Sequence, residues 1–137
     1  MNQSEVMLLS AKIDRAFAQA EALKYGDHQQ VLALAKSASR DAEVLGDFQR
    51  YARALTYQAW AYGNLNQFEA ALIAALEVLR LARTYDFVEV EARIVGVLSM
   101  VFYLCGMKDE AVFLFQHQLE LGESLQNHEF QGMALND

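Results

Sequence analysis

The chain has 137 residues, and a chain of this size buries roughly 70% of its unfolded surface, enough for one domain without a stabilising metal or disulfide. Apolar residues make up 54% of the sequence, which excludes an intrinsically disordered composition. The sequence has no proline and a single cysteine, Cys105. The lack of proline favours long helices, and the lone cysteine excludes an internal disulfide and favours a cytoplasmic location.

Charge is distributed unevenly along the chain. The net charge is −7, and residues 86–137 hold nine acidic side chains against Arg93 and Lys108. This balance argues against nucleic-acid binding, which needs clustered basic side chains. It fits either a basic partner or a solvated acidic face. The chain opens with no basic-then-apolar leader and has no uncharged apolar run of about 18 residues, so we expect neither a secretion signal nor a membrane span.

Turn signals recur about every twenty residues along the chain. Gly26, Asn66 and Gly106 share one column when the sequence is written in rows of forty, and further signals fall near 46, 86 and 126. Between the signals, apolar residues follow the i, i+3, i+4, i+7 spacing of amphipathic helices. The pattern predicts six helices, at about 4–24, 28–44, 47–65, 67–84, 87–105 and 107–124. A seventh helix is predicted to begin near 128.

The predicted helix ends carry residues that suit helix termini. Glycine or asparagine can adopt the left-handed conformation that ends a helix, and Asp or Asn can cap the next one. Three segments have capping-box spacing: Asp27 to Gln30, Asn66 to Glu69, and Asp86 to Glu89. The β-branched run at 94–97 is assigned to a helix rather than a strand, because its apolar spacing continues at 3.6 residues.

Consecutive helices therefore pair into hairpins that repeat every forty residues. The fold class predicted is all-α: a right-handed α-solenoid of three helix-turn-helix hairpins plus the start of a seventh helix. One repeat domain covers 1–137, with repeats at about 4–45, 46–85 and 86–125 and a partial repeat at 126–137. A solenoid normally ends in a capping helix, whereas this sequence stops within the first helix of a partial repeat. We therefore expect the chain to be a fragment of a longer protein.

The hairpins resemble tetratricopeptide repeats. That family's second helix opens with a turn glycine, an aromatic residue and a Glu-Ala pair; the sequence has Gly-Met-Lys-Asp-Glu-Ala at 106–111 and Asn-Gln-Phe-Glu-Ala-Ala at 66–71. The family's small residue and tyrosine match Ala59 and Tyr62. The period of forty departs from the common 34, and Leu55 and Val95 replace the family's tryptophan. The longer form is similar to arrays in bacterial regulatory proteins, including sensory regions before GGDEF-type cyclase domains.

The resemblance implies a concave groove lined by the first helix of each hairpin. The implied partner-binding positions, from the second and third repeats, are Arg53, Thr56, Trp60, Asn64, Arg93, Met100 and Tyr103. Further groove positions, where the two glycines would leave room for a ligand, are Gly63, Gly96 and Leu104. The matching positions of the first repeat are chemically bland: Ile13, Ala16, Ala20, Leu23 and Lys24.

Arg53 and Arg93 occupy one column, so two guanidinium groups on one wall could hold a carboxylate, a peptide C-terminus or a phosphate. Trp60 and its apolar neighbours would form the floor. Other interpretations remain open: Trp60 packs between hairpins, Met100 fills the core, and the arginines pair with acids such as Glu89, four residues before Arg93.

Catalytic and metal-binding patterns are missing from the sequence. His28, His117 and His128 fall on different predicted helices without ligand-spaced partners, so we expect no metal site and no cofactor. Cys105 has no neighbouring histidine in sequence and lies on an apolar face, which predicts a small buried filler. We therefore do not expect an enzyme.

The resemblance favours a non-enzymatic protein-interaction or sensory module of bacterial signal transduction. It would bind a peptide or partner protein in its groove and regulate an attached output domain. Two alternatives remain: a small-molecule sensor, and a self-association module that forms a homodimer through apolar repeat ends. Fold resemblance alone does not decide among them.

Overall fold

The computed structural model describes residues 1–124, and the side chains of residues 1–116. Within this range the chain folds into six α-helices and no strands, which confirms the all-α prediction. The predicted seventh helix near 128 lies outside the described residues. The helices are α1 (Gln3–Leu23), α2 (His28–Leu45), α3 (Phe48–Asn64), α4 (Phe68–Tyr85), α5 (Val88–Leu104) and α6 (Lys108–Ser124).

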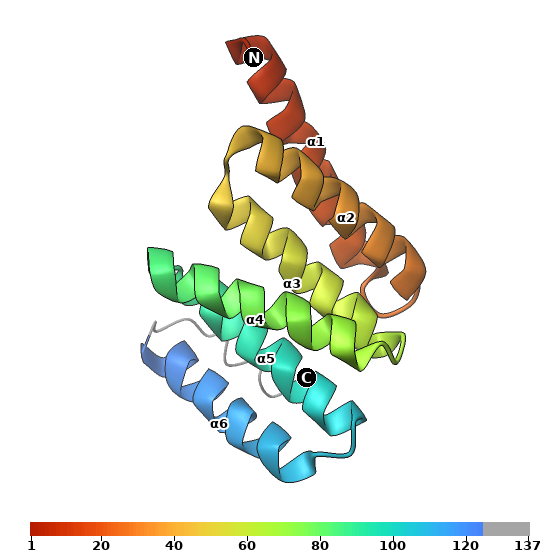
Figure 1. Ribbon diagram of the computed structural model, residues 1–137, viewed down its shortest axis with the longest axis vertical. Helices are drawn as coiled ribbons and strands as arrows, with labels where there is room; N and C mark the ends of the chain where they lie inside the picture. The colour runs from red at the N-terminus through yellow and green to blue at the C-terminus, as the bar shows by residue number, and fades with distance from the viewer. Residues whose placement is uncertain (125–137) are drawn as a thin grey trace.

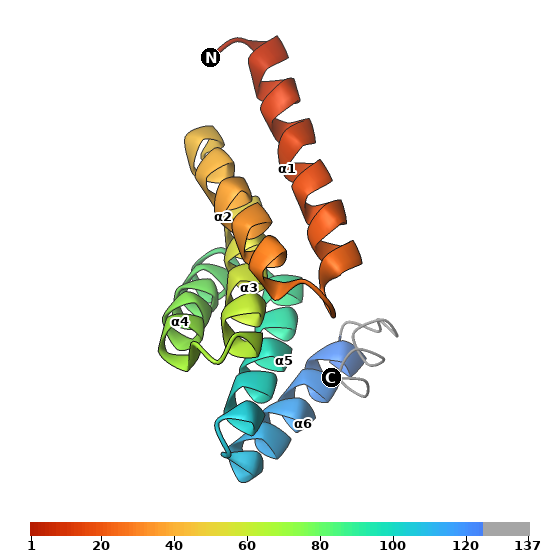
Figure 2. The same ribbon diagram turned by 90° about the vertical axis from the view of Figure 1, so that its right-hand side faces the viewer.

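Each helix packs against the next one along the chain, and α3 also contacts both α5 and α1. The assembly is elongated, with α1 at one end and α6 at the other, and the N-terminal turns of α1 project beyond α2 (Figure 1). Seen from the side, α4 lies to the left of α3, whereas α1 and α5 lie to its right, and α3 contacts both of them (Figure 2). The odd-numbered helices therefore form one face of the molecule.

Helix α3 separates two hydrophobic clusters because it carries two apolar stripes. One stripe, with Ala54, Tyr57 and Ala61, joins a cluster built around Ile13 and Val31 of the first hairpin. The other, with Ala52, Leu55 and Ala59, joins a cluster that contains buried residues of α4 and α5. Both stripes follow helical i, i+3, i+7 spacing, and their alanines let neighbouring helices approach closely.

Of the predicted turn glycines, Gly46 and Gly106 have the expected left-handed φ and Gly26 does not, although Asp27 beside it caps the next helix as expected. Asp27 caps α2, where its Oδ1 accepts a hydrogen bond from the Gln30 N–H at 3.0 Å. Gly46 ends α2 with a left-handed φ of 67°, and Asp47 then caps α3 by accepting from the Arg50 N–H at 3.0 Å. Glycine adopts this conformation without the steric cost that a Cβ would add.

The capping boxes predicted at Asn66 and Asp86 are wrong. Both residues adopt left-handed backbone conformations, with φ of 63° and 58°, so they close the preceding turn. The N-cap positions fall one residue later, at Gln67 and Phe87, and neither side chain makes a capping hydrogen bond. Asn and Asp suit both roles, so their identity did not decide between them.

Candidate functional site

The face formed by α1, α3 and α5 contains two adjoining depressions. The inner cavity has a volume of about 40 Å³ and the outer cleft about 390 Å³. The inner cavity is lined by Glu21, Lys24, Arg53, Thr56, Tyr57, Trp60, Arg93 and Val97. The outer cleft is lined by Asp14, Asp47, Gln49, Arg50, Arg53, Thr56, Glu89, Val90 and Arg93. We call the two together the α1–α3–α5 groove; they share Arg53, Thr56 and Arg93.

Four of the seven predicted partner-binding residues therefore line this groove: Arg53, Thr56, Trp60 and Arg93. The column that holds Arg53 and Arg93 places both arginines beside the same two depressions. Thr56 donates its hydroxyl hydrogen to the Ala52 carbonyl at 2.8 Å, which fixes the rotamer of its side chain. The groove thus combines two guanidinium groups with an apolar floor.

The other three predicted residues lie toward the C-terminal ends of α3 and α5 and line neither depression. Asn64 Nδ2 donates to the Trp60 carbonyl at 2.9 Å and approaches Met100 Sδ at 3.4 Å. Tyr103 is 55% exposed. The prediction that Gly63 leaves room for a ligand is wrong, because a Cβ there would lie 2.8 Å from Met100 Cε and 3.0 Å from Val101 Cγ2.

Trp60 both packs in the core and lines the inner cavity. Its side chain is only 7% exposed, and its indole N–H donates to the Lys24 carbonyl at 2.8 Å. The Lys24 ammonium lies 4.7 Å from the centroid of the indole ring, a favourable cation–π distance. The exposed Tyr25 ring makes an edge-on contact with the same indole, with centroids 5.7 Å apart. Trp60 is therefore held in place before any partner arrives.

A second polar contact joins α1 to α3 beside the inner cavity. Tyr57 donates its hydroxyl hydrogen to Glu21 at 2.7 Å and stacks on Phe17 with centroids 5.7 Å apart. Burial raises the pKa of Tyr57, and the Glu21 carboxylate adds to this shift. The Arg53 guanidinium lies over the Phe17 ring at 4.6 Å. These contacts direct Arg53 along the groove wall.

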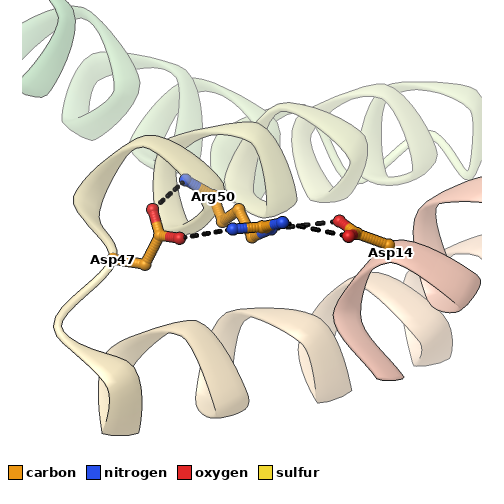
Figure 3. Close-up of polar contacts among 3 residues, drawn as sticks. All are labelled: Asp14, Asp47 and Arg50. Atoms are coloured by element: carbon orange, nitrogen blue, oxygen red, sulfur yellow. Dashed lines mark hydrogen bonds and ion pairs between the residues drawn. The ribbon is translucent and has the colours of Figure 1, made fainter. Parts of the chain in front are cut away.

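The outer cleft is bordered by an ion-pair network centred on Arg50. Its guanidinium donates to both carboxylate oxygens of Asp14, at 3.0 and 2.9 Å, and to Asp47 Oδ2 at 2.8 Å (Figure 3). The hydrogen bond from Arg50 lowers the pKa of the Asp14 carboxyl, and both acids raise the pKa of Arg50. Arg50 thereby connects α1 to the capping residue of α3 and is engaged in the free protein.

Several groove residues were missed or discounted from the sequence: Asp14, Glu21, Lys24, Arg50 and Tyr57. A usable signal was present, because three α1–α3 contacts, Asp14–Arg50, Glu21–Tyr57 and Lys24–Trp60, each join residues 36 positions apart. That spacing is the period of forty less about one helical turn. Complementary side chains at this spacing mark the seam between the two helices.

Cys105 is a further correction, since it is exposed rather than buried. Helix α5 ends at Leu104, and Cys105 follows as its C-cap residue, with its N–H still bonded to the Val101 carbonyl at 3.0 Å. Among the described residues, no group of three or more His, Cys, Asp or Glu side chains could hold a metal ion. None of the helices in the described part of the chain is long and apolar enough to cross a membrane.

Comparisons with protein-family models, with curated proteins and with solved structures give no match to this chain.

Proposed function

We propose that this chain is a non-enzymatic interaction module of the tetratricopeptide type, a right-handed α-solenoid that binds a peptide or partner protein in the α1–α3–α5 groove. The observation that carries the proposal is the shared wall formed by Arg53, Thr56 and Arg93 between the inner cavity and the outer cleft. Arginine and tryptophan are enriched among residues that dominate binding energy, and Trp60 lies beside this wall.

The repetition of contacts between helices supports the solenoid assignment. Lys24 contacts Trp60 between α1 and α3, and the residues forty positions later, Asn64 and Met100, contact each other between α3 and α5. Such repetition is expected when each hairpin stacks on the preceding one by the same operation.

The dimensions of the groove favour an elongated ligand. A cavity of about 40 Å³ admits the tip of a side chain, whereas small-molecule sites usually measure about 300–1,000 Å³ and are mostly apolar. The outer cleft, at about 390 Å³, is within that range of volume, but acidic and basic side chains line most of it. A peptide can place one apolar side chain at Trp60 and extend its backbone across the cleft. In the proposed regulatory role, binding would alter an attached output domain such as a GGDEF-type cyclase.

Selection from a random peptide library displayed on phage tests this proposal. The immobilised protein should enrich peptides whose binding weakens at least tenfold in Arg53→Ala, because a charge-assisted contact contributes roughly 1.5–3 kcal/mol. Arg40→Ala is the matched control, since Arg40 is an exposed arginine of α2. Failure to enrich any peptide, or equal binding to both variants, would contradict the proposed groove.

A self-association module is the second candidate function. The projecting N-terminal turns of α1 expose Met7 and Leu8 at 65% and 70%, and apolar side chains this exposed favour contact with another surface. This function predicts that the mass measured by light scattering rises with concentration and returns to the monomer value in Met7→Lys/Leu8→Lys. A mass that stays at one chain across the concentration range would contradict it.

A further inference from the structure

A separate cleft of about 200 Å³ lies on the other side of α3, between α2 and α4. Its floor is formed by Ala42 and Leu81, and Phe48 and Tyr51 supply aromatic walls. Glu43 and Glu77 add carboxylates, and Arg80 adds a cation. We call this depression the α2–α4 cleft; it shares no residue with the α1–α3–α5 groove.

The aromatic wall is exposed and held rigidly from behind. Phe48 is 50% exposed, and its ring stacks on Tyr85 with centroids 5.2 Å apart and planes inclined by 10°. Tyr85 stacks in turn on Phe87 at 5.6 Å. Three stacked rings fix the orientation of Phe48, so little conformational entropy is lost when a partner contacts it.

The two carboxylates of the cleft differ in whether they form an ion pair. Glu77 accepts two hydrogen bonds from Arg80, at 2.9 and 2.6 Å. Glu43 forms no ion pair with any described side chain and is exposed. Glu43 and Tyr51 line the same cleft, and burial, followed by the Glu43 charge, raises the pKa of Tyr51. The cleft therefore has one uncompensated negative charge beside an aromatic ring.

In the next repeat, the positions equivalent to Glu43 and Tyr51 hold two side chains of opposite charge. The residues forty positions after Glu43 and Tyr51 are Arg83 and Glu91, and Arg83 Nε donates to Glu91 Oε1 at 3.0 Å. In that repeat, the position equivalent to Glu43 holds the cation and the position equivalent to Tyr51 holds the carboxylate that pairs with it. In the α2–α4 cleft the same positions offer a carboxylate and a phenol ring, without a cation of their own.

We propose that the α2–α4 cleft binds an arginine side chain of a partner protein between Glu43 and the rings of Phe48 and Tyr51. Charge complementarity selects a cation, and the planar guanidinium stacks on aromatic faces while its N–H groups reach a carboxylate. Lysine offers the same charge without the planar stacking surface, so it binds less tightly. The site stands independently of the peptide groove.

Titration of the 15N-labelled protein with N-acetyl-arginine amide, followed by amide chemical shifts, tests this site. A single side-chain analogue should bind with a Kd in the millimolar range and shift the amides of Glu43, Phe48 and Tyr51 saturably. N-acetyl-citrulline amide has nearly the same shape without the charge, and it should leave these amides unshifted. Equal shifts with both compounds, or no saturable shift at this cleft, would overturn the proposal.

Two charge variants with opposite expected signs sharpen the test. Glu43→Gln should weaken binding of N-acetyl-arginine amide about fivefold, whereas Arg80→Gln should strengthen it about twofold, because the Glu77 carboxylate is released. Both positions are exposed, so folding should be retained. Glu69→Gln, an exposed glutamate of α4 outside the cleft, is the control and should leave the Kd unchanged. An unchanged Kd in Glu43→Gln would overturn the assignment.

Discussion

The contact of α1 with α3 differs in chemistry from that of α3 with α5, although both use the same repeat positions. The first is held by directional bonds: Asp14 to Arg50, Tyr57 to Glu21, and Trp60 to the Lys24 carbonyl. The second is a close apolar contact in which Gly63 faces Met100 and Val101. Directional bonds tolerate a wider helix separation, whereas the apolar contact requires the two backbones to be near each other.

The contact of α2 with α3 and the contact of α4 with α5 show the same contrast between polar and apolar side chains. Gln58 of α3 donates to the Ser39 hydroxyl of α2 at 3.0 Å, and both side chains are buried. The residues forty positions later are Leu98 and Leu79, which belong to one hydrophobic cluster. The same backbone arrangement therefore accommodates either a hydrogen-bonded polar pair or an apolar pair. The first hairpin makes polar contacts with α3 through both of its helices, α1 and α2.

The largest expected effect follows from filling the close contact at Gly63. We expect Gly63→Leu to lower the free energy of unfolding by about 3 kcal/mol, because the new side chain must displace Met100 and Val101 in a packed interface. Urea denaturation monitored by circular dichroism measures this change. A loss below about 1 kcal/mol would show that α3 and α5 separate easily, contrary to the close packing described.

Placing the polar residue in the apolar interface should have the next largest effect. Leu98→Gln should cost about 2 kcal/mol, because the buried amide would lack the hydroxyl partner that Gln58 has. Adding Leu79→Ser restores the polar pair, and the double-mutant cycle should give a favourable coupling of about 1 kcal/mol. Simple additivity of the two losses would mean that the repeats are not equivalent at these positions.

A smaller effect is expected when one directional bond between α1 and α3 is removed. Trp60→Phe keeps an aromatic ring but deletes the N–H that the Lys24 carbonyl accepts, and it should cost about 1 kcal/mol. The volume-conserving change Met100→Leu at the equivalent position should cost less, because no hydrogen bond donor is lost. A larger loss for Met100→Leu in thermal unfolding would reverse the proposed contrast.

The smallest effect concerns the exposed Asp14–Arg50 pair. The pKa of Asp14 is lowered in the folded state, so its contribution to stability is present above about pH 4 and disappears as the pH falls through the folded pKa. Solvent screening limits this contribution to about 0.5 kcal/mol. Asp14→Asn should therefore be less stable than the wild type at pH 7 but equally stable near pH 2.

Asp14→Asn made in the Arg50→Gln background serves as the control for this pH dependence. Without the Arg50 guanidinium, the Asp14 carboxylate loses the two hydrogen bonds that lower its pKa. In that background, Asp14→Asn should leave the free energy of unfolding unchanged at both pH values. An Asp14→Asn deficit that persists at low pH would show that the loss arises from packing rather than from the charge.

The helices were predictable from sequence, whereas the contacts between them were only partly so. Apolar periodicity and turn signals placed both ends of α1 to α5 and the start of α6 within about one residue of their observed positions. Periodicity reports which face of a helix is buried, whereas the prediction that Arg53 and Arg93 share one groove came from the family resemblance and from their common column in the forty-residue alignment. It does not report backbone conformation at a helix end, so it missed that Asn66 and Asp86 close turns rather than cap helices, and it wrongly predicted a buried Cys105.

Which side chains meet between two helices depends on how far one helix is shifted along the other. The apolar pattern of a single helix does not specify that shift. The groove acids Asp14 and Glu21 were missed for this reason, although both precede their α3 partners by 36 residues. Gly63 was assigned to ligand space because a glycine in a helix leaves room beside it. Only the position of α5 shows that Met100 fills that room.

Fluorescence of Trp60 during titration with a library-selected peptide is the most direct measurement of groove binding. Trp60 is the single tryptophan of the sequence, and it lines the inner cavity. A peptide that enters the α1–α3–α5 groove should change its emission saturably, and Arg53→Ala should shift the midpoint at least tenfold higher. A peptide that binds by calorimetry while Trp60 emission stays constant, with equal affinity in Arg53→Ala, would contradict binding at this groove.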